Sequence, residues 1–274
     1  MRISKNIASL NIYKAYSRNI KKQNASLGRI SSGVKINSSK EDPNAIAQSE
    51  RLRMQIRGLQ MAARNTQDGV SMLQTTQGGL TGITESLQRV RELLVKAGGT
   101  TNDADKVIIQ NEIDQMIKGA DDLANNTEFN GVKLLVGGEN DGTDFIETVT
   151  GANVGEKIKI LKYDLDTVGL GLDDIDVNDI DGSLNKIDNA LDTVIGARSK
   201  YGALENRLES TFNSIIGMAD KIQSAESSIR DTDMAEEMME YAKYNILIEA
   251  STAMMAQSNR FPQDALKILE NVRS

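Results

Sequence analysis

Residues 52–97 read LRMQIRGLQMAARNTQDGVSMLQTTQGGLTGITESLQRVRELLVKA, and apolar side chains recur in them at steps of four and three residues. This spacing keeps one apolar stripe on one side of an α-helix for about six heptads, which is typical of helices that pack lengthwise. Asp42 and Pro43 suit the start of such a helix, and Gly98-Gly99 suit its end. The stripe consists of Leu52, Ile56, Leu59, Ala63, Thr66, Val70, Leu73, Gln77, Leu80, Thr84, Leu87, Val90, Leu94 and Ala97.

Three further segments carry seams of the same kind, at 109–123, at 187–222 and, more weakly, near the start of the chain. The third seam continues past residue 222 with a drifting register. We expect Pro262 to interrupt this last segment and to begin a short final helix. The weaker first seam and the C-terminal continuation consist of Tyr13, Tyr16, Ile20, Leu27, Ile30 and Val34, and of Met234, Met238, Tyr241, Ile248 and Met254.

The pattern changes between about residues 130 and 183, where Gly and Asp become dense. Residues 145–149 and 157–163 suit strands, and three Asn-Gly or Asp-Gly pairs supply turns. The predicted fold is therefore mainly α. It is an elongated bundle of long antiparallel coiled-coil helices from both termini, with a small β-hairpin region in the middle.

The 274-residue chain contains no Cys and no His. These absences remove the thiolate nucleophile, the commonest metal ligand and the commonest general base near neutral pH. Residues 151–157 superficially resemble a phosphate-binding loop and 177–188 a calcium loop, but each lacks residues that its motif requires. We predict no enzymatic activity, no cofactor and no metal.

Charge is unevenly distributed: residues 1–64 carry 13 Lys and Arg against 3 Asp and Glu, although the whole chain has a net charge of −7. The basic residues spread over several helix faces with few aromatics among them, so we expect no nucleic-acid partner. A solvated helix face, or contact with an acidic neighbouring subunit, explains them better. With no run of 18 apolar residues we expect no membrane insertion, and with no cleaved signal peptide we expect another export route.

Specific blocks identify a family. The chain resembles bacterial flagellins from one end to the other, including the "RLSSGLRIN" block at 29–37. It departs from the family pattern at 43–46, at Phe261-Pro262 and at 271–274. The similar blocks are residues 1–3 with 6–11, then 29–37, 55–59, 65–69, 87–93, 127–131 and 225–235.

The resemblance implies filament-core segments at 1–42 and 223–274, and a rod domain at 43–222 whose small β region covers about 130–183. It implies a secreted structural subunit that self-assembles into the helical, extracellular flagellar filament for motility. The alternatives are a hook–filament junction protein and a helical surface adhesin. We assign self-assembly to Ile3, Ile7, Leu10, Leu27, Ile30, Met238, Tyr241, Ile248, Met254 and Leu266.

The resemblance also implies partners besides further copies of the chain. These are a flagellar export chaperone, the type III export apparatus, and the filament cap and hook-junction proteins. Met is adaptable at interaction surfaces, so we predict the chaperone contact at Met234, Met238, Met254 and Met255. Toll-like receptor 5 is a further candidate partner, through the positions that match its site in the family: Arg89, Leu93 and Glu112.

Overall fold

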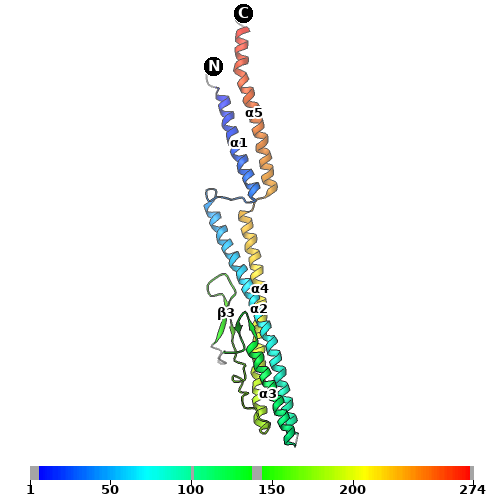
Figure 1. The fold of residues 1–274 in the computed structure, drawn as a ribbon. Coiled ribbons are helices and arrows are strands. Elements are labelled where there is room, and N and C mark those ends of the chain that lie inside the picture. Colours follow the sequence, from blue (N-terminus) through cyan, green and yellow to red (C-terminus); the bar gives the residue numbers. More distant parts are fainter. Residues whose placement is uncertain (1–5, 100–101, 138–143, 272–274) are drawn as a thin grey trace. The chain divides into compact units, whose positions relative to one another are not determined.

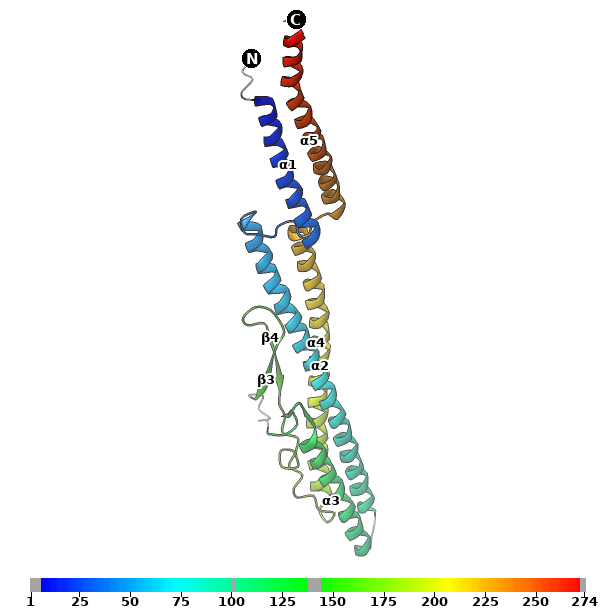
Figure 2. The same cartoon turned by 45° about the horizontal axis from the view of Figure 1, so that its top comes forward.

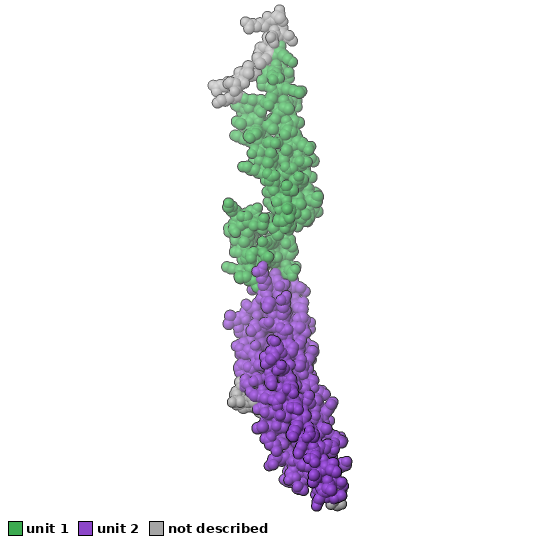
Figure 3. Space-filling view, viewed as in Figure 1, with its two compact units in different colours: residues 1–54, 222–274 green, residues 55–221 purple. Residues whose placement is uncertain are grey.

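The computed structural model describes residues 6–99, 102–137 and 144–271 (Figure 1). Long helices with two small antiparallel strand pairs confirm the predicted mainly α fold. Two compact units appear in Figure 3: the terminal unit, residues 1–54 with 222–274, and the central unit, residues 55–221. The elements are α1 (Ile7–Ser32), α2 (Pro43–Gly98), α3 (Asp103–Asn126), β1 (Glu128–Phe129), β2 (Val132–Lys133), β3 (Phe145–Val149), β4 (Lys157–Leu161), α4 (Ile180–Arg230) and α5 (Met234–Asn271).

The core of the central unit lies where α2, α3 and α4 run side by side (Figures 1 and 2). The predicted α2 stripe faces this core, and its members from Val70 to Ala97 are buried except the half-buried Gln77. Ile83 and Leu93, beside the stripe, are buried as well. A helix with two neighbours needs an apolar face wider than a heptad seam, which explains the additional buried positions.

Local signals at the start of α2 act as the sequence predicts. The Asp42 carboxylate accepts hydrogen bonds from the N–H groups of Asn44 and Ala45, both at 3.0 Å. Pro43 is the first helical residue, where a missing N–H costs no helical bond. The cap therefore sets the start of this long helix, nine residues before the apolar stripe begins at Leu52.

The small β region packs on the helices of the central unit through its apolar residues. β3 pairs with β4 from Phe145↔Leu161 to Val149↔Lys157, and Ile158 and Ile160 are buried. The Tyr201 hydroxyl on α4 donates to the Leu161 carbonyl at 2.8 Å, and the Leu134 carbonyl lies 3.3 Å away. The strand predictions are confirmed, with β4 ending at Leu161.

The terminal unit is built on the antiparallel pair α1 and α5. The predicted seam is right in part: Tyr16, Ile20, Ile30, Val34, Tyr241 and Ile248 are half-buried, whereas Tyr13, Leu27, Met234, Met238 and Met254 are exposed. The prediction was wrong at the exposed five because the real stripe contains polar residues, which a search for apolar repeats passes over. Buried or half-buried seam residues are Ile12, Tyr16, Asn19, Gln23, Ser26 and Ile30 on α1, and Glu237, Tyr241, Tyr244, Ile248, Ser251, Met255, Ser258 and Pro262 on α5.

The prediction that Pro262 begins a separate helix is also wrong, since Pro262 lies inside α5. A proline within a helix leaves the carbonyl four residues earlier without its N–H donor. That carbonyl belongs to Ser258, and the Asn6 side-chain amide donates to it at 3.0 Å. A contact from the other end of the chain thus compensates for the break.

The remainder of the terminal unit joins the ends of four helices. Gly33 ends α1 in the left-handed conformation (φ 71°), and Val34 forms a bridge with Asp231. Arg230 donates to the Glu50 carboxylate at 2.9 Å, which lowers the pKa of Glu50.

The compact units of the structure divide between residues 54 and 55 and between residues 221 and 222. The predicted domain boundaries, after residues 42 and 222, concern roles in a filament and stay predictions.

Candidate functional site: outward faces of the terminal helices

Apolar side chains point outward from both helices of the terminal unit. Ile7, Leu10 and Leu27 on α1, and Met238 and Met254 on α5, are each at least half exposed. The remaining predicted self-assembly residues differ: Ile30, Tyr241 and Ile248 are half-buried at the α1–α5 seam. Ile3 lies outside the described residues, and so does the side chain of Leu266, although its backbone belongs to α5.

The terminal unit has almost no apolar core of its own. Among its described residues, Tyr244 is the one buried apolar side chain, and the other buried residues are Ser26, Ser49 and Glu237. Large exposed apolar surfaces on a protein mark sites where other molecules bind. The outward faces of α1 and α5 are therefore suited to pack against further helices.

Sequence reasoning missed part of this surface. Tyr13, Met239, Ile246 and Phe261 are exposed as well. On α5, the seven-residue repeat of Glu237, Tyr244 and Ser251 could have revealed them. That repeat faces α1, so apolar residues of α5 that lie off it point away from α1.

Charge differs between the two helices. α1 carries five Lys or Arg and no acidic residue, whereas α5 carries six Asp or Glu against three Lys or Arg, among them the exposed Glu236 and Glu249. Tyr13, Lys14, Arg18 and Lys21 line a shallow basic groove of about 500 Å³ together with Ser17. Opposite charges on two helices favour their association and steer the encounter of two copies.

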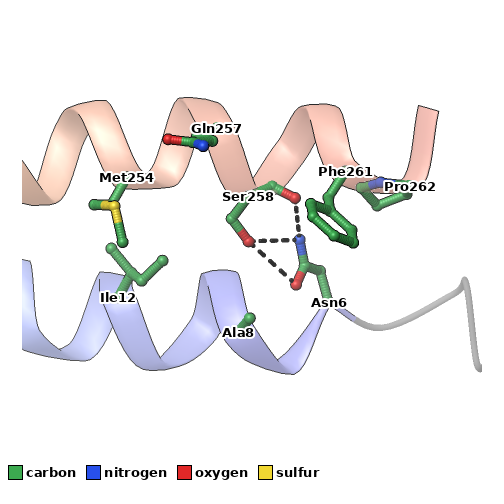
Figure 4. A pocket seen from close by; sticks show the side chains of 8 residues that line it. All are labelled: Asn6, Ala8, Ile12, Met254, Gln257, Ser258, Phe261 and Pro262. Carbon is green, nitrogen blue, oxygen red and sulfur yellow. Dashed lines mark hydrogen bonds between the residues drawn. The ribbon is translucent and has the colours of Figure 1, made fainter. Parts of the chain in front are cut away.

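A second groove lies at the far end of the α1–α5 pair (Figure 4). Its volume is about 440 Å³, and Ile12 faces Met254 across it while Phe261 and Pro262 close one end. Asn6 and Ser258 hydrogen-bond to each other on its floor. Its lining is mostly apolar, so the groove suits an apolar side chain better than a charged ligand.

The predicted receptor residues occupy two environments in the central unit. Arg89 bridges Glu92 at 3.1 Å and Glu112 on α3 at 3.0 Å, and the bond to Glu112 raises the pKa of Arg89. Leu93 is 1% exposed, because the side of α2 that carries it belongs to the core. An incoming protein can touch Arg89 and Glu112 directly, whereas the Leu93 side chain can support them only from beneath.

The predicted chaperone residues all lie on α5. Met234, Met238 and Met254 are exposed, and Met255 is half-buried toward α1. Three of the four are accessible while α1 and α5 are paired, and a partner that needs Met255 would have to separate the two helices.

The described residues contain no group of three or more His, Cys, Asp or Glu side chains arranged to hold a metal ion. Across the same part of the chain, every helix is too short or too polar for a membrane span. The exposed helical faces are thus the main candidate for function.

Comparison with known proteins identifies relatives over the whole chain. The model of the bacterial flagellin N-terminal helical region matches residues 3–140, and that of the C-terminal helical region matches 184–269. The chain is 40% identical to flagellin of Bacillus subtilis (strain 168), with 98% of this chain and all of that protein covered. It is 36% identical to the flagellar filament 31.3 kDa core protein of Treponema maltophilum, covering 88% and 90% of the two chains.

Among solved structures, a putative flagellar hook-associated protein from Vibrio parahaemolyticus superposes with a TM-score of 0.57. It covers 70% of this chain and all of that one, at 17% sequence identity. At that identity the likeness concerns the fold alone.

Proposed function

The chain belongs to the bacterial flagellin family and is a structural subunit of the flagellar filament, and we propose that it polymerises through the outward faces of α1 and α5. The observation that carries this proposal is the terminal unit's distribution of apolar residues, which point outward around a nearly coreless helix pair. Burying apolar surface contributes about 25 cal/mol per Å², and here such burial requires other copies of the chain.

Polymer geometry follows from how one surface meets another. When one face of a subunit binds a different face of the next and the rotation does not close, the result is an open helical filament. A basic α1 and a partly acidic α5 supply two such unlike faces.

The test is seeded growth of the purified full chain, viewed by negative-stain microscopy beside a variant that lacks residues 1–30 and 245–274. Long filaments from the full chain alone would support the proposal. Long filaments from the truncated chain would refute it. Short oligomers from the full chain would favour a hook–filament junction protein.

We also propose that the chain is secreted through the flagellar type III apparatus to the cell exterior, with an export chaperone on α5. The exposed Met234, Met238 and Met254 support this placement, because Met side chains adapt to varied apolar partners. Deleting 234–274 should abolish binding to the chaperone, whereas deleting 1–32 should leave it intact. Retained binding after the first deletion would refute the placement.

We propose recognition by Toll-like receptor 5 through the exposed Arg89–Glu112 pair. Arg89→Asp should remove receptor binding, measured with purified receptor ectodomain. Arg91→Asp is the matched control, because Arg91 is a neighbouring exposed arginine that pairs with Asp188 at 2.7 Å. Equal loss in both variants, or none in Arg89→Asp, would refute the assignment.

A further inference from the structure

The seam between α1 and α5 is unusually polar for a helix pair. On α1 the seam includes the polar residues Asn19, Gln23 and Ser26, and on α5 the most buried seam residues are Glu237 and Tyr244. Polar residues at seam positions weaken a helix pair, but they can specify one alignment of the two helices, because a slipped alignment leaves them unpaired.

The first polar contact joins the start of α1 to the proline of α5. Pro262 leaves the Ser258 carbonyl without its helical donor, and Asn6 Nδ2 lies 3.0 Å from that oxygen (Figure 4). The same side chain caps α1 by accepting from the Ser9 N–H at 3.1 Å. Asn6 therefore satisfies open backbone groups of two helices at once, and it can do so in one alignment.

The second contact lies at the opposite end of the seam. Arg29 Nη1 donates to both oxygens of Glu237, at 3.3 and 3.4 Å, and Glu237 is 7% exposed. A buried carboxylate that loses its partner is strongly destabilising. Between the two ends, Gln23 donates to Asn245 at 3.1 Å.

The three contacts follow one antiparallel alignment. As α1 is traced backward from Arg29 through Gln23 to Asn6, their partners advance along α5 from Glu237 through Asn245 to Ser258. This alignment places half-buried Ala15 near half-buried Ser251.

The charge pair alone would tolerate one slip, and the Asn6 contact excludes that slip. Shifting α1 by one heptad in one direction brings Lys22 toward Glu237. A Lys22–Glu237 ion pair would then replace Arg29–Glu237, so charge pairing alone does not exclude this slip. That shift removes Asn6 from the Ser258 carbonyl. The opposite shift carries Glu237 beyond the end of α1.

We propose that the Asn6–Ser258 contact created by Pro262 and the Arg29–Glu237 pair together select one antiparallel register of α1 and α5. The seam specifies alignment, and it leaves the apolar side chains on the outward faces. A single register presents the same outward surface on every copy, which a regular polymer requires. Only this last consequence rests on the proposed function. The register is the alignment in which α1 and α5 of one chain pair, and oxidation traps that alignment even where the free chain pairs the two helices only transiently.

Disulfide trapping can measure the register, because the natural chain contains no Cys. One double variant, Ala15→Cys with Ser251→Cys, reports the observed alignment. The other, Ala8→Cys with Ser251→Cys, reports a slip of one heptad. The full chain is oxidised at low concentration, and intramolecular disulfides are quantified by peptide mass spectrometry. We expect the first pair to form at least about tenfold faster, equivalent to about 1.4 kcal/mol of preference.

Both contacts are then removed with Asn6→Asp, Pro262→Ala, Arg29→Gln and Glu237→Gln in each cysteine background. An ionised carboxylate at position 6 can still accept from the Ser9 N–H, but it cannot donate to the Ser258 carbonyl. Pro262→Ala restores the helical donor and strengthens α5 itself, so helix content by circular dichroism should not fall. The preference should nevertheless drop to within about threefold, because several registers become comparable. Arg91→Gln with Asp188→Gln, an ion pair of the central unit, is the matched control and should leave the preference unchanged.

Three outcomes would overturn the proposal. The first is equal trapping of the two cysteine pairs when both contacts are present, and the second is a trapping preference that survives removal of both contacts. The third is that removing the contacts lowers helix content and slows disulfide formation in both cysteine pairs. The last would mean that the contacts serve stability alone. Filament growth is scored separately on the cysteine-free chain. Loss of filaments with an intact register preference would count against the proposed function and not against the register.

Discussion

The central and terminal units contain helices of similar character but place their apolar residues oppositely. In the central unit Leu73, Leu80 and Leu87 are fully buried among three helices and a β region. In the terminal unit Leu10, Leu27 and Met238 face outward, and the seam holds polar pairs. Helices of similar character thus form a core where a third element covers the apolar side chains, and leave these side chains exposed where none does.

This difference implies a division of roles. The central unit can fold within one chain because it buries its own apolar surface. The terminal unit gains too little burial to offset the entropy of ordering two long helices. It should therefore become ordered mainly when other copies cover its outward faces, as expected for segments that fold on binding.

The largest expected effect lies in the central core. Leu80→Ala removes a fully buried side chain and should lower the free energy of unfolding by about 2–5 kcal/mol, including the cavity term. Urea unfolding followed by circular dichroism measures it. A loss below about 1 kcal/mol would mean that the central unit does not depend on this core.

Tyr201→Phe should cost about 1–3 kcal/mol, because the part-buried Leu161 carbonyl loses its donor. Burial also raises the pKa of Tyr201. The folded state therefore holds the phenol proton more tightly than the unfolded chain does. The free energy of unfolding is unaffected below the ordinary tyrosine pKa of about 10 and decreases as pH rises above it. The urea midpoint should therefore fall between about pH 9 and pH 11, and fall less in Tyr201→Phe. An equal fall in both proteins would contradict this assignment.

Leu10→Asp tests the outward face. Free-chain stability should change by less than about 0.5 kcal/mol, since the side chain is exposed, while the concentration needed for filament growth should rise at least about tenfold. Val154→Asp, at an exposed loop residue of the central unit, is the matched control. If both variants polymerise alike, the α1 face is not the interface.

The smallest effect compares two glycines in the left-handed conformation, Gly131 in the β1–β2 turn (φ 76°) and Gly33 at the end of α1 (φ 71°). Gly131→Ala should destabilise the central unit by about 1 kcal/mol. Gly33→Ala should leave the main unfolding transition of the free chain unchanged, because that helix end is not yet ordered. Equal shifts of the transition would show that both units unfold together.

Much of the central unit could be predicted from sequence, because its signals are local. The α2 stripe from Val70 to Ala97 and the β3 strand each follow from spacing or residue type. The Asp42 cap, in the terminal unit, was predictable in the same way. Burial of Leu93 could not, since it depends on α3 covering a second side of α2.

The terminal seam was predicted less well for a physical reason. Its most buried positions include Ser26 and Glu237, and a search for apolar periodicity ignores polar residues. The Ser258 carbonyl that Pro262 leaves without a helical donor is bonded by Asn6, which lies 252 residues away in the sequence. The outward apolar residues were recognised in part, through Leu10 and Met238, because the family resemblance directed attention to both termini.

Amide hydrogen exchange on the free chain and on the polymer tests the central claim most directly. In the free chain at low concentration, we expect slow exchange in residues 73–94 and 187–208 and fast exchange in 7–30 and 237–258. In the polymer the two terminal segments should become protected as well. Slow exchange of both terminal segments in the free chain would contradict the claim that other copies complete the terminal unit.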